Sequence, residues 1–327
     1  MARRNSFFEE QGMFVVGGES LIDLVPVSAE PGAERLALAG GSPFNCALAL
    51  ARLGNDTGFL CPISRDEHGD LLLARLAEAG AGVLLGERVE APTTRAIVTF
   101  NARMQASYVF ERGADRAFTR EGLLAALPQR VELYQIGGFC PIEAEDAVVW
   151  SAVVEAALAR GAVVSIDINV REKLIGDEAG YRERLSGFLD RAHIVKLSDE
   201  DHRWLAPDRT IAAHAAELLG RPNCELVVVT LGEEGSLAFS RRAEARAVIY
   251  TPPVFGDTVG AGDSLMAGIL TWLAENDALA PGRLPALDDA ALAAMLRFGA
   301  VVAGLNCAEK GCKPPTRAEV EAVLAEA

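Results

Sequence analysis

Short apolar runs rich in β-branched residues alternate along this chain with longer segments that have the apolar periodicity of helices. The strand-like runs are 13–16, 131–136, 162–168, 193–197 and 226–230. The amphipathic segments between them are 70–79, 143–160, 181–191 and 210–219. Strands that are apolar on both faces belong in a parallel sheet covered by helices on both sides. The pattern therefore predicts an α/β fold with a doubly wound, mainly parallel sheet, and ligands at the carboxyl ends of its strands.

Two segments break this alternation. Residues 21–39 and 93–110 contain alternating apolar and polar side chains, which is typical of half-exposed strands. They predict a second, smaller β-sheet. No linker rich in Pro, Gly or Ser separates the chain into parts, and 327 residues can bury a large core. We therefore expect one domain over residues 13–327, preceded by a tail at residues 1–12.

Composition excludes several classes of protein. The net charge of −15 argues against nucleic acid or an anionic membrane as a partner. Residues 1–12 lack the apolar segment of a signal peptide, and no uninterrupted apolar run reaches the length of a membrane span. We expect a cytoplasmic protein with reduced, partly buried thiols, because the six cysteines have neither metal-site nor disulfide-framework spacing. These are Cys46, Cys61, Cys140, Cys224, Cys307 and Cys312.

Residues 257–263 read Asp-Thr-Val-Gly-Ala-Gly-Asp and lead directly into an apolar helical segment. Because Gly260, Ala261 and Gly262 carry little or no side chain, their backbone N–H groups can point at an anion, and the start of the helix adds its positive dipole end. A carboxylate beside a phosphate site repels the ligand, so Asp263 needs another purpose, such as accepting the proton of an attacking hydroxyl. The structural alternative is an ordinary loop in which Asp263 caps the helix.

A second glycine-rich junction precedes an apolar helix at residues 39–54. Gly40 and Gly41 allow a ligand to approach the backbone, and the Asn45 amide can both donate to and accept from a polyhydroxylated ligand. The structural alternative is a loop-to-helix junction capped by Ser42. Since the chain has no G-x-x-x-x-G-K-[ST] sequence, a Walker-type phosphate loop is excluded.

The two motifs, in this order and about 220 residues apart, resemble the signatures of the ribokinase-like (phosphofructokinase-B) carbohydrate and nucleoside kinases. Residues 15–25, with Asp23, are similar to the opening strand of that family, and residues 229–236 are similar to its nucleotide loop. Four further segments resemble the bacterial fructokinases most closely within the family. They are 110–116, 165–171, 195–201 and 308–316.

The resemblance implies an ATP-dependent sugar kinase with a small β-sheet lid, formed by about 21–39 and 93–110, that is also used for dimerisation. It implies that D-fructose is converted to fructose 6-phosphate, and that Asp263 is the base and Gly260, Ala261 and Gly262 form the anion hole. The implied sugar-binding residues are Asp23, Gly40, Gly41, Asn45 and Arg171. The implied nucleotide-binding residues are Lys196, Thr230, Gly232 and Gly235.

The resemblance also implies Mg²⁺ with ATP, and K⁺ in many members of the family. Asp201 and Asp257 are the candidate metal residues, with the Val259 carbonyl beside Asp257. Ser198 and Asp201 stand where the family has Asn-x-x-Glu, so Glu200 is an alternative to Asp201. Positive charge near the phosphates could come from Arg171, Lys196, Arg112 or Arg116, and the adenine pocket is expected at helix 296–306.

Other functions remain open on the sequence alone. A kinase for 2-keto-3-deoxygluconate or for another sugar would carry the same motifs, because the residues that distinguish sugars are not recognisable by pattern. A ribokinase or nucleoside kinase is a weaker alternative, since the expected lid supplies few aromatic side chains. From another class, a sugar-binding regulator without catalysis is possible, although the presence of Asp263 and the Gly-Ala-Gly element argues against it.

Overall fold

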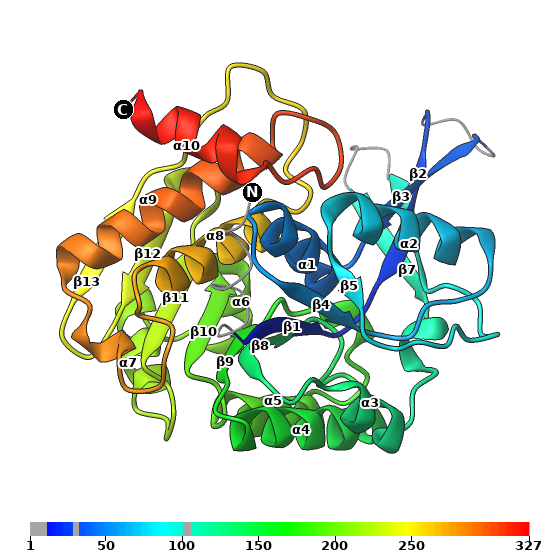
Figure 1. The fold of residues 1–327 in the computed structure, drawn as a ribbon, viewed down its shortest axis with the longest axis horizontal. Coiled ribbons are helices and arrows are strands. Elements are labelled where there is room, and N and C mark those ends of the chain that lie inside the picture. Colours follow the sequence, from blue (N-terminus) through cyan, green and yellow to red (C-terminus); the bar gives the residue numbers. More distant parts are fainter. Residues whose placement is uncertain (1–11, 29–32, 101–105, 327) are drawn as a thin grey trace, which may run out of the picture.

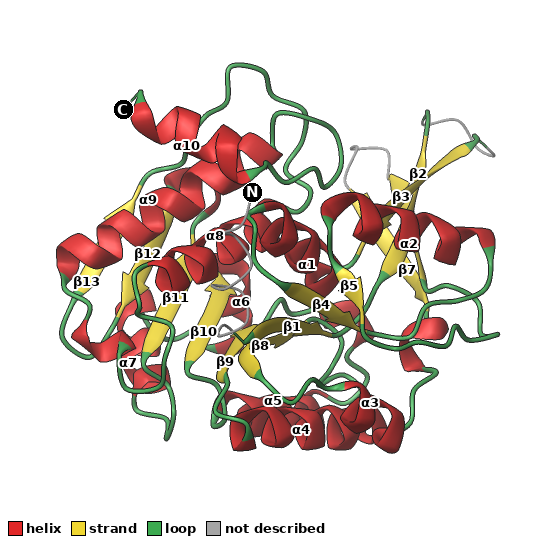
Figure 2. Ribbon diagram, in the orientation of Figure 1, coloured by secondary structure: helices red, strands yellow, loops and turns green. Residues whose placement is uncertain are grey.

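The computed structural model describes residues 12–28, 33–100 and 106–326. Most of the strands in this part of the chain form one large sheet (Figures 1 and 2). Seven strands, from β5 to β11, are parallel, and the last two are antiparallel. In spatial order they are β13 (Glu244–Ala247), β12 (Ser236–Phe239), β11 (Leu226–Thr230), β10 (Ile194–Ser198), β9 (Val163–Asp167), β8 (Val131–Gly137), β1 (Met13–Gly17), β4 (Thr57–Leu60) and β5 (Gly82–Val83).

Helices cover both faces of this sheet (Figure 1). One face carries α1 (Ser42–Arg52), α2 (Glu67–Ala79), α8 (Ala261–Glu275), α9 (Asp289–Asn306) and α10 (Arg317–Ala325). The other carries α3 (Arg120–Ala126), α4 (Ala144–Ala159), α5 (Glu178–Leu189), α6 (Asp199–Leu205) and α7 (Ile211–Leu219). Strand residues alternate between the two cores: Phe14 and Val16 pack on the first side and Val15 on the second. The predicted doubly wound, mainly parallel sheet is confirmed.

A second sheet of four strands lies beside the large one, in the order β3 (Arg35–Gly40), β2 (Leu21–Pro26), β6 (Arg95–Phe100) and β7 (Ala106–Glu111) (Figure 2). The chain passes from β1 of the large sheet into β2 of the small one through residues 18–20. The predicted second sheet is thus present. The tail at 1–11 and parts of the expected lid segments, 29–32 and 101–105, lie outside the described residues.

The strand order places a switch point at β1. This strand has β4 on one side and β8 on the other, so the connections run outward from it in both directions. In open α/β sheets the crevice outside the carboxyl ends of such strands is where ligands bind. The residues that follow β1 and β8 are therefore the first place to look for a site.

Within the described residues, α9 is long and apolar enough to cross a membrane by length and composition alone. It includes Asp289 and Arg297 and packs against α8 and the antiparallel strands β12 and β13. Since 56% of this apolar helix is buried within the protein, α9 is here a helix of the first core.

Candidate active site

The two glycine-rich motifs meet where the N-termini of α1 and α8 pack together. The Ser42 hydroxyl donates to Oδ1 of Asp263 at 2.7 Å, and the Asn45 amide donates to Oδ2 at 2.9 Å. Each carboxylate oxygen of Asp263 is thus held by a residue more than 200 positions away in the sequence. Two hydrogen bonds of this kind fix the orientation of the carboxylate.

Neither motif is an ordinary capped helix start, so the structural alternatives considered for them are wrong. The N-cap of α8 is Gly260, in the left-handed region at φ +75°, and Asp263 lies inside the first turn. The N-cap of α1 is Gly41 at φ +106°, and Ser42 is the first helical residue. Neither cap residue provides a side-chain hydrogen bond. The side chains of Ser42 and Asp263 are therefore free to interact with each other.

The turn at the start of α8 is closely surrounded. A Cβ at Gly260 would lie 2.6 Å from the Sγ of Cys312, and a Cβ at Gly262 would lie 3.1 Å from the Nζ of Lys196. Ala261 is the first residue of the helix. The Ala261 N–H donates to the Thr258 carbonyl oxygen at 3.1 Å. The first turn of α8 thus combines the backbone N–H groups of Gly262 and Asp263 with an ammonium group beside them, which is the composition of an anion site.

Lys196 is buried (6% exposed), and its ammonium donates to Oδ2 of Asp167 at 2.7 Å. Burial lowers the pKa of Lys196, but the neighbouring Asp167 carboxylate outweighs this effect, so the pKa is raised and the lysine stays charged. Burial raises the pKa of Asp167 to about 6, against the opposing effect of Lys196. Oδ1 of Asp167 has no hydrogen-bond partner among the described residues.

Asp263 is subject to the same opposing forces. Burial raises its pKa, whereas the charge of Lys196 and the hydrogen bonds from Ser42 and Asn45 lower it. The net direction is upward. A carboxylate with a raised pKa is a better proton acceptor than one in water, provided that it is ionised at the working pH.

Asp23 lies on β2, in the small sheet, and its Oδ2 sits over Gly40, where a Cβ would approach it to 2.5 Å. Burial raises the pKa of Asp23 to about 6, and the charge of Arg171 lowers it. Arg171 also lowers the pKa of Asp263, and its guanidinium donates to Oδ1 of Asn169 at 2.5 Å. Asp23 and Asp263 are therefore both within electrostatic reach of Arg171.

The residues predicted for the nucleotide follow strands on the same edge of the large sheet. Thr230 is the last residue of β11, and Gly232 begins a 3₁₀ turn (Gly232–Glu234) at φ +58°. Gly235, at φ +93°, closes the turn; a Cβ there would lie 2.0 Å from the carbonyl oxygen of Ala247. This loop has a fixed shape and needs glycine at both positions.

The two candidate metal residues already accept hydrogen bonds from the protein. Oδ2 of Asp201 accepts from the Ser198 backbone and hydroxyl, and its Oδ1 accepts from the Val170 backbone at 2.7 Å. The oxygens of Asp257 accept from the backbone N–H groups of Val259 and Gly311. An ion at either carboxylate would share or displace these bonds. Among the described residues, no cluster of three or more His, Cys, Asp or Glu side chains could hold a metal ion.

The remaining candidate cations are paired with carboxylates near the small sheet. Arg112 donates to Asp115 and Arg116 donates to Asp146, at 2.6 Å and 2.8 Å at their closest. By contrast, Lys196 and Arg171 both act on Asp263. The structure thus separates the four cations that the sequence could not distinguish.

Sequence reasoning missed Glu19, which lies in the crossing between the two sheets. Its carboxylate is buried (4% exposed) and accepts from the backbone N–H groups of Ser42 and Phe139. No local signal distinguishes it, since Gly18-Glu19-Ser20 is a short polar crossing. Ser42 was considered only as a cap, because nothing local indicates that its hydroxyl points at Asp263.

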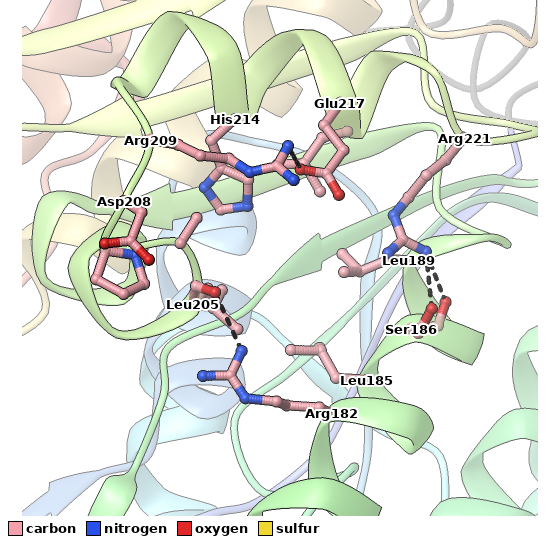
Figure 3. A pocket seen from close by; sticks show the side chains of 13 residues that line it. Arg182, Leu185, Ser186, Leu189, Leu205, Asp208, Arg209, His214, Glu217 and Arg221 are labelled. Carbon is pink, nitrogen blue, oxygen red and sulfur yellow. Dashed lines mark hydrogen bonds and ion pairs between the residues drawn. The ribbon is translucent and has the colours of Figure 1, made fainter.

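A separate hollow of about 420 Å³ lies between α5, α6 and α7 (Figure 3). It contains none of the predicted site residues. Its charged groups bond one another or the backbone: Arg209 pairs with Glu217, Arg182 donates to the Leu205 carbonyl, and Arg221 donates to Ser186. With its cations occupied in this way, the hollow offers little to a charged ligand.

Comparison with known proteins finds one family over nearly the whole chain. Residues 12–319 match the pfkB family of carbohydrate kinases. The chain is 32% identical over 283 residues to a fructokinase of Rhizobium leguminosarum bv. trifolii, covering 86% of this chain and 85% of that protein. It is 29% identical to probable fructokinase-3 of Arabidopsis thaliana, covering 96% and 91%.

Solved structures give the same result. The fold is similar to the crystal structure of fructokinase with bound ATP from Xylella fastidiosa, with a TM-score of 0.86, 28% identity, and coverage of 96% of this chain and 98% of that chain. The similarity therefore includes both sheets and both helical layers.

Proposed function

Since the chain belongs to the pfkB family of carbohydrate kinases, we propose that it transfers the γ-phosphate of ATP to D-fructose and forms fructose 6-phosphate. The observation that carries this proposal is the Asp263 carboxylate, held by Ser42 and Asn45 beside the open first turn of α8. The fructokinases among the relatives, and the ATP bound in the structure with a TM-score of 0.86, support the choice of substrates.

In this proposal Asp263 accepts the proton of the attacking sugar hydroxyl. Burial gives the carboxylate a raised pKa, and its two hydrogen bonds hold it in one orientation. A positioned general base contributes about 10²–10⁴-fold to a rate. Ser42 and Asn45 act on the base: they keep one lone pair of each oxygen occupied and leave the others for the substrate.

The transferring phosphoryl group would lie at the first turn of α8. The backbone N–H groups of Gly260, Gly262 and Asp263 would face its oxygens, and the ammonium of Lys196 lies beside Gly262. Ala261 contributes a small side chain to this turn, because its N–H donates to the Thr258 carbonyl oxygen. Fixed donors and charges of this kind stabilise negative charge that develops in the transition state, without reorganising. The Asp167 carboxylate holds the ammonium in place.

For the sugar we propose Asp23, Gly40, Gly41, Asn45 and Arg171. Oδ1 of Asn45 is buried without a partner among the described residues, so it is available to a hydroxyl group. The Asp23 carboxylate can accept from two adjacent hydroxyls, and an analogue that lacks them would leave a desolvated charge unpaired. Gly40 leaves space for the Asp23 carboxylate.

The nucleotide would lie over Thr230, Gly232 and Gly235, with its phosphates toward Lys196. Mg²⁺, when bound, would neutralise negative charge on the phosphates. We propose that it is held mainly by ATP and water, with Asp201 in an outer position, because the Asp201 oxygens are occupied by backbone donors. Asp257 and the Val259 carbonyl are the proposed K⁺ ligands, and a titration with KCl at constant ionic strength tests that assignment.

We also propose that the enzyme is a cytoplasmic homodimer. All six cysteines are free and buried, which suits a reducing compartment. Leu36 and Val27, at the outer end of the small sheet, are 56% and 55% exposed, and Leu36 pairs with Val25 on the face that carries Asp23. Leu36→Glu should give a monomer in sedimentation analysis, whereas Val148→Glu, at a still more exposed valine of α4 (68%), should leave the dimer intact. A monomeric wild type would overturn this proposal.

An ADP-release assay over a panel of fructose, 2-keto-3-deoxygluconate, ribose, tagatose and adenosine tests the proposed function. We expect turnover on fructose, collapse in Asp263→Asn, and normal turnover in Asp288→Asn, which removes only the charge of the exposed residue that caps α9. Turnover on another sugar alone would keep the mechanism and change the substrate. Sugar binding without turnover on any member of the panel would place the protein among non-catalytic regulators.

A further inference from the structure

Glu19 is a buried acid that the proposed chemistry does not use. It lies at the switch point of the large sheet, directly after β1, where the chain crosses to the small sheet. One carboxylate oxygen accepts from the Ser42 N–H at 3.3 Å and the other accepts from the Phe139 N–H at 3.0 Å. No ion pair of Glu19 is found within the described residues, so these two backbone groups are its main partners there.

The surrounding backbone is shaped to admit this carboxylate. Gly138 has φ +60°, and a Cβ there would lie 2.2 Å and 2.3 Å from the two oxygens of Glu19. Gly41 has φ +106°, and a Cβ there would lie 2.8 Å from the Glu19 carbonyl oxygen. Two glycines in the left-handed region, nearly 100 residues apart, therefore leave room for the same residue.

Glu19 does for α1 what a cap residue normally does. The free N–H groups at a helix start need acceptors, and the N-cap Gly41 has no side chain to provide one. Glu19 supplies an acceptor and a negative charge from a segment 23 residues earlier. Its partner at this end, Ser42, is the residue whose hydroxyl donates to Asp263.

The second partner extends the connection to the small sheet. The Phe139 ring packs edge-on against Phe110 of β7, with centroids 5.4 Å apart, and the guanidinium of Arg112 lies 4.9 Å from its centroid. The Glu19 carboxylate thus holds two backbone N–H groups. That of Ser42 lies beside the proposed base, and that of Phe139 lies beside the sheet that carries Asp23.

We infer that Glu19 is a positioning residue for phosphoryl transfer: its carboxylate fixes the first turn of α1 so that the Ser42 hydroxyl stays on Asp263. This inference rests on the proposed role of Asp263 as the base. A carboxylate is required because it offers an acceptor on each side, whereas a glutamine amide offers only one and would turn an NH₂ group toward the other N–H donor.

A double-mutant cycle in kcat tests the inference, with wild type, Glu19→Gln, Ser42→Ala and the double variant assayed on fructose and ATP. We expect Glu19→Gln to lower kcat about 10- to 100-fold, as misplacement of a reacting group does, with much smaller changes in both KM values. In the Ser42→Ala background the same substitution should cost less than about threefold, because the connection to Asp263 is already cut.

Asp66→Asn is the matched control, since Asp66 also accepts backbone N–H groups but makes no contact with Ser42 or Asp263. It should lower the melting temperature without lowering kcat. If Glu19→Gln behaves in the same way, or if its effect on kcat is the same with and without the Ser42 hydroxyl, Glu19 is only structural and the inference is overturned.

A second variant covers the case in which Glu19→Gln does not fold. Gly138→Ala leaves Glu19 in place but forces its carboxylate away, and it should show the same loss of kcat and the same dependence on Ser42. The wild type is assayed first. If it turns over no sugar, the proposed function fails, and this inference fails with its premise; turnover in the wild type with additive effects overturns the inference alone.

Discussion

Two acids of this protein, Asp66 and Glu19, both accept backbone N–H groups, yet their pKa values shift in opposite directions. Burial of Asp66 is outweighed by hydrogen bonds from Thr93, Gly69 and Ser64, so its pKa falls to about 2. Glu19 is fully enclosed and has two backbone donors, so burial dominates and its pKa rises to about 7. The balance between burial and the number of hydrogen bonds decides the sign of the pKa shift.

The region around Asp66 and the region around Glu19 also differ in the pKa shifts of their acids. Asp66 caps α2 and ties it to the start of β6, and its charge stabilises the fold. Glu19, Asp23 and Asp167 surround the proposed active site, and all three have raised pKa values. Keeping them ionised costs stability, which indicates that this region is built for chemistry and the capping region for folding.

The largest expected effect on stability comes from breaking the buried Lys196–Asp167 pair of the site. Lys196→Met removes the ammonium beside Gly262 and leaves Asp167 buried without its partner. We expect a loss of about 3–5 kcal/mol in the free energy of unfolding and a fall in kcat of about 10²–10³-fold. Denaturant melts and ADP release measure the two effects.

Two further variants control for this result. Lys313→Met breaks an exposed pair with Glu309 and should cost about 0–1 kcal/mol with no effect on kcat. Adding Asp167→Asn to Lys196→Met should restore part of the stability but none of the activity. Recovery of activity in that double variant would contradict the role given to the Lys196 charge.

The next effect concerns the pH dependence of stability. Raised pKa values mean that the folded state holds protons that the unfolded state has released. The contribution of Asp23, Asp167 and Glu19 to stability is therefore full below about pH 4 and is lost as the pH rises to about 7. For Glu19, raised from 4.5 to about 7 against the opposing charge of Arg171, the change is up to about 3 kcal/mol.

Thermal melts from pH 4.5 to 7.5 measure this trend. The melting temperature of the wild type should fall with rising pH, and that of Glu19→Gln should fall less steeply. A wild-type stability that stays constant or increases over this pH range would mean that the pKa values of these three buried acids are not raised together.

The smallest expected effect comes from a substitution of Asp66, the residue that caps α2. Asp66→Asn keeps an acceptor for the Gly69 N–H but turns its NH₂ group toward the buried Thr93 N–H, so it should cost about 1–3 kcal/mol and leave kcat unchanged. Because the pKa of Asp66 is lowered, its contribution is present above about pH 4 and disappears as the pH falls toward 2. Stability curves of this variant and the wild type should therefore converge in strong acid; a constant gap would assign the loss to packing.

The sequence predicted the fold well because its signals are local. Alternating apolar runs and helical periodicities marked the elements of the large sheet, and the two glycine-rich motifs marked the helix starts that meet at Asp263. The partners of individual acids could not be predicted. Asp201 was a candidate for metal binding, but one of its oxygens accepts from Val170, which lies on another loop, and only the folded chain brings the two together.

The roles of Glu19 and Ser42 could not be predicted from the sequence either. Neither stands out by residue type, since Glu19 is one acid in a short polar crossing and Ser42 is one serine before a proline. Their importance arises from contacts among four segments that are not adjacent in sequence: the crossing after β1, α1, α8 and the turn after β8. A local pattern carries no information about such a contact.

The most direct test of the central claim separates binding from chemistry in Asp263→Asn. Fructose binding is measured by calorimetry, and turnover is measured by ADP release with the same protein. An asparagine keeps the size of the side chain but cannot accept the proton. We predict a fructose Kd within a few-fold of the wild type and a kcat lower by about 10²–10⁴-fold. Turnover within about tenfold of the wild type would contradict the role of Asp263 as the base.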